Sequence, residues 1–269
     1  MNFGFIGAGN MAGAIIKGMT IGTKSYDGNC IYVTSKTKVS SNELAQLCGV
    51  IACNCSEEVI QNADILILAV KPYVLSEILP SLKEIILEKN PLLISIAAGK
   101  TLDFLESLLS KTTPIVRVMP NINAKVGAST SGFCCNNAVT QKQKEIVISL
   151  FSTIGSVIEI QESHFGIFSV IAGSAPAFAY LYMDSLARAA QKAGMPKKQA
   201  LEIAAQTVLG SAKMVLESKE HPWELIDQVC SPGGTTIEGI SSLQKSGFES
   251  ALTKAFDAVL EKDKLIAQK

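Results

Sequence analysis

The sequence predicts an α/β protein in which an N-terminal doubly wound, mainly parallel sheet is followed by an all-α domain. Short β-branched runs alternate with helix-like segments from residue 1 to about 160, and this alternation is typical of βαβ units. After about residue 162 the strand-like runs stop, and only helical patterns remain. We therefore expect one domain over residues 1–161 and a second over residues 162–269.

Seven apolar runs in the first part have the length and β-branched composition of buried strands. The segments between them have apolar residues spaced by three and four, as from Leu75 to Ile86, which predicts helices. In chain order, the predicted strands are Phe3–Ile6, Ile31–Thr34, Val50–Ala52, Ile65–Val70, Leu92–Ile96, Ile115–Met119 and Val157–Ile160.

The second part consists of helical patterns interrupted by glycine and proline. The segment from Lys197 to Ser218 has one broad apolar face rich in small residues, which suits close helix packing across a dimer. The stretch from Phe165 to Met183 is uncharged and reaches the length of a membrane span. Pro176 interrupts it and Asp184 follows directly, so we expect a helix buried between subunits and no membrane span.

The composition excludes several classes of partner. Twenty-four basic residues balance 24 acidic ones, and Arg117 and Arg188 are the only arginines, so we expect no nucleic acid or anionic membrane partner. The seven cysteines form no CxxC pair and there is no histidine cluster, so we expect no metal site. The chain opens directly on a strand-like run, without a signal peptide, which indicates a cytoplasmic protein. Its hydrophobic content of 48% favours an oligomer.

A glycine-rich turn follows the first predicted strand and matches the GxGxxA pattern of dinucleotide sites. Gly7 permits the tight turn, Gly9 lets the backbone approach a pyrophosphate, and Ala12 lets the helix pack against the strand. Amides at the start of that helix would hold the phosphates. An ordinary glycine-rich turn is the alternative. The candidate cofactor residues here are Gly7, Ala8, Gly9, Asn10 and Met11.

The end of the second predicted strand indicates which dinucleotide binds. An NAD site usually places a carboxylate there, whereas this chain has Thr34, Ser35, Lys36, Thr37 and Lys38. Hydroxyls and lysines suit a 2′-phosphate, so NADPH is favoured, although these lysines could also only solvate a loop. Because ligands of such sheets lie beyond the carboxyl ends of the strands, two further strand ends are candidates for the cofactor or plain loop residues. They are Ala69, Val70, Lys71 and Pro72, and Ala97, Ala98 and Gly99.

The acid–base residues available are few. His164 begins the long apolar helix, His221 precedes a short helix at Pro222, and no GxSxG elbow occurs, so a hydrolase is not indicated. A dinucleotide domain joined to a helical domain suggests hydride transfer. No lysine lies between Gln161 and Gln191, where an alcohol dehydrogenase of the related β-hydroxyacid type would carry its base. Reduction of an imine needs no such lysine, because the imine nitrogen is basic enough to take a proton from a hydroxyl or solvent.

The segment SPGGTTIEG, which begins at Ser231, is the best place for an anionic imine. Pro232 favours an extended Ser231, two glycines expose their amides, and the following helix adds its positive end. Such a nest suits a carboxylate. Thr235 and Glu238 match a capping box, which would leave Thr236 for the ligand. The candidate substrate-binding residues are Ser231, Gly233, Gly234, Thr235 and Thr236, with Thr236 also the candidate catalytic residue.

The chain resembles Δ1-pyrroline-5-carboxylate reductases almost from end to end. The resemblance rests on FIGAGNM at 5–11, AVKP at 69–72, AAG at 97–99, RVMPN at 117–121, AGSAPAFAY at 172–180, AAQTVLGSAKM at 204–214 and VCSPGGTTIEG at 229–239. The last of these is highly specific to the family. The resemblance implies a Rossmann-like NADP domain, a helical dimerisation domain of the 6-phosphogluconate dehydrogenase C-terminal type, and NAD(P)H-dependent reduction of 1-pyrroline-5-carboxylate to L-proline, the last step of proline biosynthesis.

The resemblance also implies residue roles and an assembly. Thr236 would contact the imine nitrogen, Asn54 would lie on the 2′-phosphoryl or adenosine side, and Asn121 would lie by the nicotinamide. A homodimer, often built further into rings, is implied. One departure is Ala175, where the family usually has a glycine, and the added methyl group could alter how the substrate ring packs. A related imine or β-hydroxyacid oxidoreductase and a non-catalytic NADP-binding sensor are the alternatives.

Overall fold

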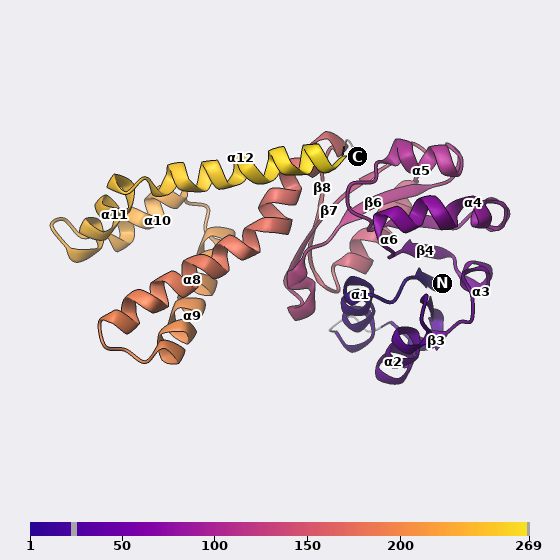
Figure 1. The fold of residues 1–269 in the computed structure, drawn as a ribbon, viewed down its shortest axis with the longest axis horizontal. Helices are drawn as coiled ribbons and strands as arrows, with labels where there is room; N and C mark the ends of the chain where they lie inside the picture. The colour runs from indigo at the N-terminus through magenta and orange to yellow at the C-terminus, as the bar shows by residue number, and fades with distance from the viewer. Residues whose placement is uncertain (23–25, 268–269) are drawn as a thin grey trace. The chain divides into compact units, whose positions relative to one another are not determined.

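The computed structural model describes residues 1–22 and 26–267 (Figure 1). The chain divides into two compact units, Met1–Gly173 and Ser174–Lys269. The first contains the sheet with its helices, and the second contains helices alone among the residues described. The prediction of a doubly wound α/β part followed by an all-α part is confirmed.

The described residues of the first unit form an eight-stranded sheet in the order β3-β2-β1-β4-β5-β6-β7-β8. All neighbouring strands are parallel except β6 and β7. The strands are β1 (Phe3–Ile6), β2 (Ile31–Thr34), β3 (Ile51–Ala52), β4 (Ile65–Leu68), β5 (Leu92–Ser95), β6 (Ile115–Met119), β7 (Ser129–Cys135) and β8 (Gly155–Glu159).

Seven of these strands lie where the sequence predicts them, three with the same bounds and four with ends shifted by one or two residues, but β7 is missing from the prediction. Its first four residues, Ser129–Gly132, are small or polar and lack the β-branched apolar run expected of a strand. It forms because β6 and β8 supply hydrogen-bonding partners on both sides. The tertiary ladder therefore overrides a weak local preference.

Both faces of the sheet are covered by helices. Alternate residues of β4 enter two different buried clusters: Ile65 and Ile67 join one, and Leu66 and Leu68 join the other. The helices of this unit are α1 (Asn10–Ile21), α2 (Lys38–Cys48), α3 (Ser56–Asn62), α4 (Pro72–Lys89), α5 (Leu102–Leu108), α6 (Gln141–Phe151) and α7 (Phe165–Phe168), with 3₁₀ turns η1 (Gly28–Cys30), η2 (Ile122–Val126) and η3 (Glu162–His164).

An ion pair ties the end of this unit to its sheet. Arg117 on β6 is buried, and its Nη1 lies 3.0 Å from Oε1 of Glu162 in η3. Its guanidinium lies 4.1 Å from the ring centroid of Phe165. The same carboxylate oxygen accepts the amide of Leu102 at the start of α5. Arg117, the only arginine in the sequence of this unit, thus holds η3 and the start of α7 against the sheet.

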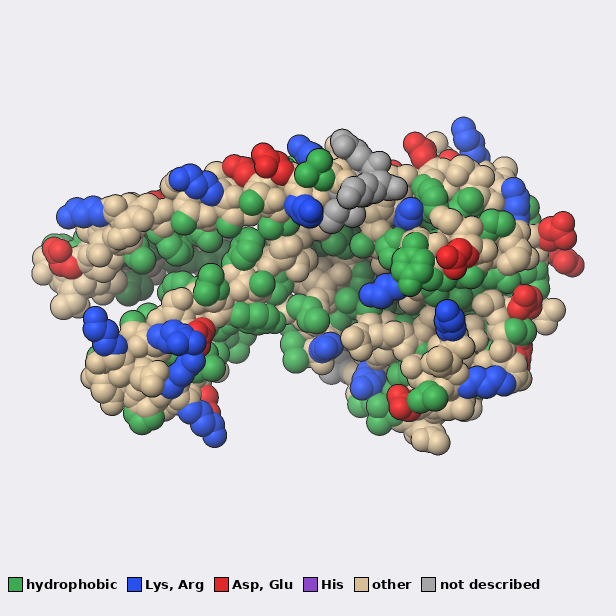
Figure 2. Space-filling model, viewed as in Figure 1, with side chains coloured by type: hydrophobic (Ala, Val, Ile, Leu, Met, Phe, Trp, Pro, Cys, Tyr) green, Lys and Arg blue, Asp and Glu red, His purple; other side chains and the backbone are tan. Residues whose placement is uncertain are grey.

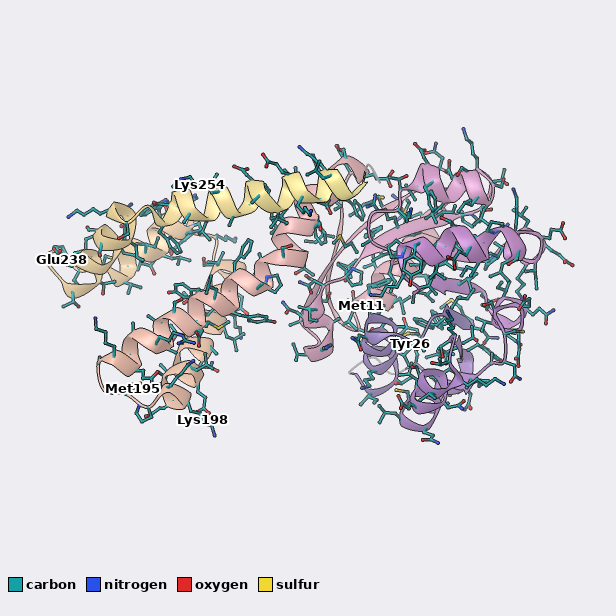
Figure 3. All side chains as sticks on the ribbon, in the orientation of Figure 1. Met11, Tyr26, Met195, Lys198, Glu238 and Lys254 are labelled. Carbon is teal, nitrogen blue, oxygen red and sulfur yellow. The ribbon has the colours of Figure 1, made fainter. Side chains whose placement is uncertain are left out.

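The second unit contains α8 (Ala175–Lys192), α9 (Lys197–Glu217), α10 (Pro222–Val229), α11 (Thr235–Lys245) and α12 (Phe248–Ala267). The predicted helix over 197–218 is confirmed as α9, and Met195 lies in the turn between α8 and α9 (Figure 3). That turn uses Gly194 at φ +102°. Asp184 of α8 pairs with Lys197 of α9 at 2.8 Å, which ties the two helices together.

One helical run in the described residues, Glu162–Lys192, is long and apolar enough to cross a membrane by length and composition. A core helix of a soluble protein passes the same test. Within the isolated chain only 17% of its most apolar window is buried. Its apolar side chains therefore still need a covering surface.

Candidate active site

The turn between β1 and α1 requires glycine at its first position. Gly7 has φ +110°, and a Cβ there would lie 2.4 Å from the carbonyl oxygen of Ala69. The Gly7 amide donates to the carbonyl of Thr34 at 2.9 Å. The turn therefore brings the carboxyl ends of β1, β2 and β4 together, at the edge of the sheet where ligands of such folds bind.

The next glycine leaves the start of α1 open. Gly9 is the N-cap residue of α1 and provides no side-chain cap to its first amides. A Cβ on Gly9 would meet no atom within 4 Å. Ala12, one turn on, is 1% exposed and packs in the core behind the turn. The start of α1 thus combines amides without a side-chain cap and open space beside Gly9, an arrangement that suits an anion.

A cavity of about 450 Å³ lies against this turn. It brings together candidate residues from separate segments, because α1, the end of β4 and the 3₁₀ turn η2 all border it. Its lining residues are Gly9, Asn10, Met11, Ala14, Ala69, Lys71, Ile96, Ile122, Ala124 and Lys125. Five of these, Gly9, Asn10, Met11, Ala69 and Lys71, are sequence candidates, and Lys125 is a charged residue that sequence reasoning missed.

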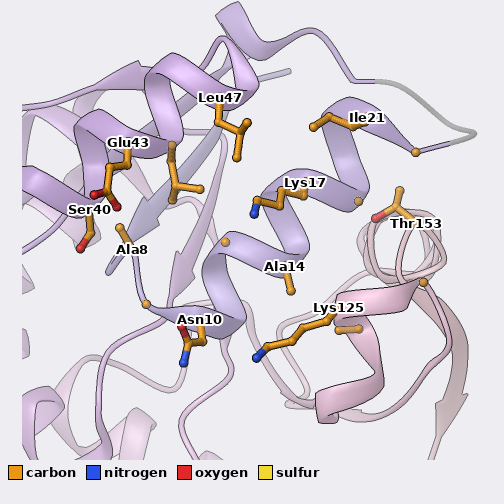
Figure 4. A pocket seen from close by; sticks show the side chains of 17 residues that line it. Ala8, Asn10, Ala14, Lys17, Ile21, Ser40, Glu43, Leu47, Lys125 and Thr153 are labelled. Atoms are coloured by element: carbon orange, nitrogen blue, oxygen red, sulfur yellow. The ribbon is translucent and has the colours of Figure 1, made fainter. Parts of the chain in front are cut away.

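A second cavity, of about 830 Å³, follows α1 toward α2 (Figure 4). Ala8, Gly9 and Asn10 line its start, and Lys17, Glu43 and Lys125 are its charged lining residues. Figure 4 shows the Lys125 side chain extending from η2 toward the start of α1, where Asn10 lies. The two cavities share Gly9, Asn10, Ala14, Ala124 and Lys125, so they meet at the glycine turn.

The other strand-end candidates do not line these cavities. Ala97 is 5% exposed and belongs to the core, and Gly99 has φ +73°. Pro72 is the first residue of α4, with Lys71 as its N-cap. Val70 packs against the second buried cluster. Pro72 and Ala97 thus have clear structural roles in the chain.

The candidates for a 2′-phosphate lie at the end of β2. The Ser35 hydroxyl donates to the carbonyl of Thr37 at 2.6 Å and accepts the amide of Ser41 at 3.2 Å. Lys38 Nζ donates to Asn54 Oδ1 at 2.8 Å, which joins the ends of β2 and β3. Lys36 is exposed. The structure therefore places Lys36, Lys38 and Asn54 in one region, while Ser35 organises the start of α2.

Asn121 has a defined structural role. It is 6% exposed, and its Nδ2 donates to the carbonyl of Ala172 at 2.9 Å. Ala172 lies in a π-helical stretch, Ser169–Ser174, four residues before Pro176. In an α-helix that carbonyl would accept from residue 176, but proline has no N–H. The amide of Asn121 supplies the missing donor, and its Oδ1 accepts the amide of Thr130 at 3.3 Å.

Three thiols of the sheet unit, Cys53, Cys134 and Cys135, are poorly suited to act as nucleophiles. Burial raises the pKa of Cys53 to about 11 and that of Cys134 to about 12, so both are protonated at neutral pH. Burial likewise raises the pKa of Cys135 to about 11. Across residues 1–22 and 26–267, no group of three or more His, Cys, Asp or Glu side chains could hold a metal.

The SPGGTT loop of the helical unit forms a tight turn. The Gly234 amide donates to the carbonyl of Ser231 at 2.9 Å, and Gly233 has φ +67°, as a type II turn with Pro232 and Gly233 at its centre requires. Gly234 is the N-cap of α11, with no side-chain cap. The amides at the start of α11 are therefore free of side-chain partners, as an anion site requires.

The prediction that Thr235 caps α11 through a capping box with Glu238 is wrong. The helix begins at Thr235, so the cap position falls on Gly234. The turn is responsible, because it gives Gly234 the extended backbone of an N-cap, at ψ 174°. Thr235 and Thr236 are both exposed, so the structure does not divide the two hydroxyls between a cap and a ligand.

Comparison with known proteins gives the class first. A family model described as "NADP oxidoreductase coenzyme F420-dependent" matches residues 2–99, and one described as "Pyrroline-5-carboxylate reductase dimerisation" matches residues 162–266. With the open glycine turn, these matches define an NAD(P)-dependent oxidoreductase with a helical dimerisation domain.

Full-length relatives give the family. The chain is 39% identical to a pyrroline-5-carboxylate reductase of Escherichia coli, over 98% of each chain. It is 40% identical to one of Methanosarcina acetivorans, over 99% of this chain and 98% of the relative. A pyrroline-5-carboxylate reductase structure from Coxiella burnetii matches with a TM-score of 0.92 at 35% identity, over 98% of this chain and 97% of that one. The chain belongs to the pyrroline-5-carboxylate reductase family.

A further structure bears on the cofactor. The pyrroline carboxylate reductase of Plasmodium falciparum, solved with NADP bound, matches with a TM-score of 0.85 at 30% identity. The match covers 99% of this chain and 98% of that one. Similarity at this level extends over both compact units of the chain.

Proposed function

We propose that this protein reduces 1-pyrroline-5-carboxylate to L-proline with NADPH, as the last step of proline biosynthesis. The observation that carries the proposal is the open turn at Gly7 and Gly9, set against a cavity, in a chain of this family. The family relatives support an imine reductase over a β-hydroxyacid oxidoreductase or a non-catalytic sensor. When bound, NADPH supplies the hydride that reduces the C=N carbon.

The chain would hold the cofactor mainly through backbone. The amides of Gly9, Asn10 and Met11, residues that line the two cavities, would bind the pyrophosphate, with Ala8 part of the same turn. Lys71, which lines the smaller cavity, would contact the nicotinamide half. Val70, Pro72, Ala97, Ala98, Gly99 and Asn121 would shape that side, Asn121 through its bond to Ala172.

The preference for NADPH would come from the end of β2. Ser35 stands where an NAD site usually carries a carboxylate, and Lys36, Lys38 and Asn54 are grouped nearby. Two ammonium groups suit the doubly charged 2′-phosphate. Steady-state rates with NADPH and NADH test this point. A double variant, Lys36→Met with Lys38→Met, should lose efficiency with NADPH and keep it with NADH.

The substrate would be held by its carboxylate. The amides of Gly233, Gly234 and Thr235 and the hydroxyl of Ser231 form the proposed cradle, at the positive end of α11. The hydroxyl of Thr236 would donate a hydrogen bond to the imine nitrogen. As the C=N carbon takes the hydride, the nitrogen takes a proton and becomes the secondary amine of proline.

The assembly proposed is a cytoplasmic homodimer, which could build further into rings. The apolar surface left exposed in the helical unit supports it, as does the dimerisation model over residues 162–266. We place the functional boundary at 161/162, where that model begins, although the compact units divide twelve residues later, between Gly173 and Ser174.

The two exposed threonines supply a matched test of the reaction. Thr236→Ala should lower kcat by roughly 100-fold, within the range for loss of a positioned proton donor. It should leave the Kd for NADPH within about twofold, since a loop of the helical unit does not build the glycine turn. Thr235→Ala should keep most of its kcat, because its backbone amide remains.

Three outcomes would count against this proposal or a part of it. Purified protein that consumes no NADPH with 1-pyrroline-5-carboxylate would remove the function altogether. An equal loss of kcat in Thr235→Ala and Thr236→Ala would contradict the specific role of the Thr236 hydroxyl but not the proposed reaction. Full activity in Thr236→Ala would show that solvent supplies the proton.

A further inference from the structure

Lys125 is a cation placed where the two cavities meet. It lines both of them, together with Gly9 and Asn10 of the glycine turn. Figure 4 shows its side chain extending toward the start of α1. Lys17, in contrast, lines only the larger cavity, further along α1. The ammonium group of Lys125 thus lies on the side of the glycine turn and the start of α1.

The backbone that carries Lys125 is firmly held. Its neighbour Ala124 is 5% exposed, and the Ala124 amide donates to the carbonyl of Asn121 at 3.1 Å. Gly127, at φ +70°, ends the 3₁₀ turn and donates to the carbonyl of Ala124 at 3.2 Å. The Asn121 side chain is itself fixed by Ala172 and Thr130. A flexible side chain is therefore presented from a rigid base.

The charges around the turn do not neutralise this lysine. Lys71 and Lys125 are the two charged side chains among the residues that line the smaller cavity, and no carboxylate lines it. The larger cavity adds Lys17 and one carboxylate, Glu43, which lies on α2 (Figure 4). None of the ion pairs found in the described part of the chain includes Lys125. This excess of positive charge suits an anion at the turn.

We propose that Lys125 closes over the pyrophosphate of the bound dinucleotide, opposite the amides at the start of α1. The inference rests on the proposed function and adds a cofactor-positioning residue to it. The phosphates would then be held from two sides, by the helix start and by an ammonium group from η2. Because NADPH and NADH share the pyrophosphate, Lys125 would serve both equally, unlike Lys36 and Lys38.

The test compares three lysine variants by calorimetric titration with NADPH and with NADH, in the absence of substrate. Lys125→Met should weaken both dinucleotides by roughly tenfold, the size expected for losing one charge-assisted hydrogen bond. Lys125→Arg should stay within about threefold of the wild type, since it keeps the charge. Lys17→Met, which removes a lysine that lines only the larger cavity, should change neither affinity. Thermal unfolding checks that every variant is folded.

Three results would overturn the inference. Unchanged affinities in Lys125→Met would show that the lysine is only a solvated side chain. A loss confined to NADPH would assign Lys125 to the 2′-phosphate. A raised KM for the imine with unchanged dinucleotide affinities would assign it to the substrate carboxylate. Each can occur while the wild type reduces 1-pyrroline-5-carboxylate, so the inference can fail without the proposed function.

Discussion

The sheet unit and the helical unit differ in how much of their apolar surface they bury within one chain. Large side chains such as Phe5, Phe133 and Phe151 are fully buried in the sheet unit. In the described part of residues 174–269, the buried hydrophobic residues are three alanines, Ala187, Ala200 and Ala204. The first unit closes its own core, whereas the second one barely has a core of its own.

The apolar side chains of the helical unit remain at its surface. Leu181 is 68% exposed, and Leu216 is 84% exposed. Hydrophobic side chains gather along α8 and α12 on the face drawn in Figure 2. There an apolar groove of about 660 Å³ is lined by Phe178, Ala179, Leu181, Tyr182, Ser185, Leu186, Ala189, Leu243, Phe248, Ala251, Leu252 and Ala255. An apolar patch of this kind is typical of a protein–protein interface, which fits the proposed homodimer.

The largest effect on stability is expected from a substitution in the exposed apolar groove of the helical unit. Leu181→Glu places a charge in the apolar groove, and an unpaired buried charge costs roughly 3–5 kcal/mol, so the proposed dimer should dissociate. Leu87→Glu, on α4 of the sheet unit and also exposed, should leave the assembly intact. Sedimentation velocity gives the masses. A Leu181→Glu variant with the wild-type mass would show that this groove stays uncovered in the assembly.

The next effect distinguishes two glycines of the sheet unit. Gly7→Ala should destabilise the unit by about 1–3 kcal/mol, because an alanine is strained at positive φ and its Cβ meets the backbone of Ala69. Gly9→Ala should leave the melting temperature unchanged, since its Cβ enters free space, but weaken NADPH binding. Calorimetric unfolding and titration separate the two. Equal melting temperatures for both variants would contradict the strain at Gly7.

A smaller loss is expected at Asn121. Asn121→Leu removes the side-chain partners of the buried Ala172 carbonyl and the part-buried Thr130 amide, which should cost about 1 kcal/mol. Asn123→Leu, in the 3₁₀ turn η2 that follows Asn121, is the control. Denaturant unfolding should show a loss for the first variant and little for the second. Similar stability in both would mean that water replaces the Asn121 amide.

The smallest effect concerns the exposed ion pair between α8 and α9. Hydrogen bonds from Lys197 and then Arg188 lower the pKa of Asp184. A carboxyl with a lowered pKa adds stability above its unfolded pKa, and that stability is lost as the pH falls through the folded pKa. Asp184→Asn should therefore lower the melting temperature slightly at neutral pH, by at most a few degrees, with less effect in acid.

A second surface variant serves as the control for Asp184. Glu217→Gln removes a pair with Lys213 that lies within α9 alone, at 3.6 Å, so it should change the melting temperature less. Melting curves at neutral and acid pH measure both variants. A larger loss for Asp184→Asn in acid than at neutral pH would contradict the direction of the Asp184 pKa.

Much of the fold could be predicted because its signals are local. The β-branched runs, the helical spacing from Leu75 to Ile86 and the glycine turn at Gly7 each lie within a short segment. The prediction of the fold fails where residues outside the segment determine its local structure. Strand β7 needs β6 and β8 as partners, and the cap of α11 moves to Gly234 because the preceding turn sets its backbone.

The candidate site divides in the same way. Gly7, Gly9 and the SPGGTT loop can be recognised in the sequence, because positive φ, bare amides and a helix start depend on adjacent residues. The hydrogen bond from Asn121 to Ala172 and the position of Lys125 beside α1 cannot, because they join segments far apart in the chain. No local pattern marks a lysine that meets a distant glycine turn.

By itself, then, the sequence determined the division into an α/β part and an all-α part, most of the strands and helices, and the glycine turn. These features follow from backbone preferences and from the spacing of apolar residues, and both can be read within a single segment. Only the tertiary structure decided which side chains share the cavities, which hydroxyls stay free and how much of each helix is exposed. Those properties depend on packing between segments, because burial and contact are set by neighbours in space.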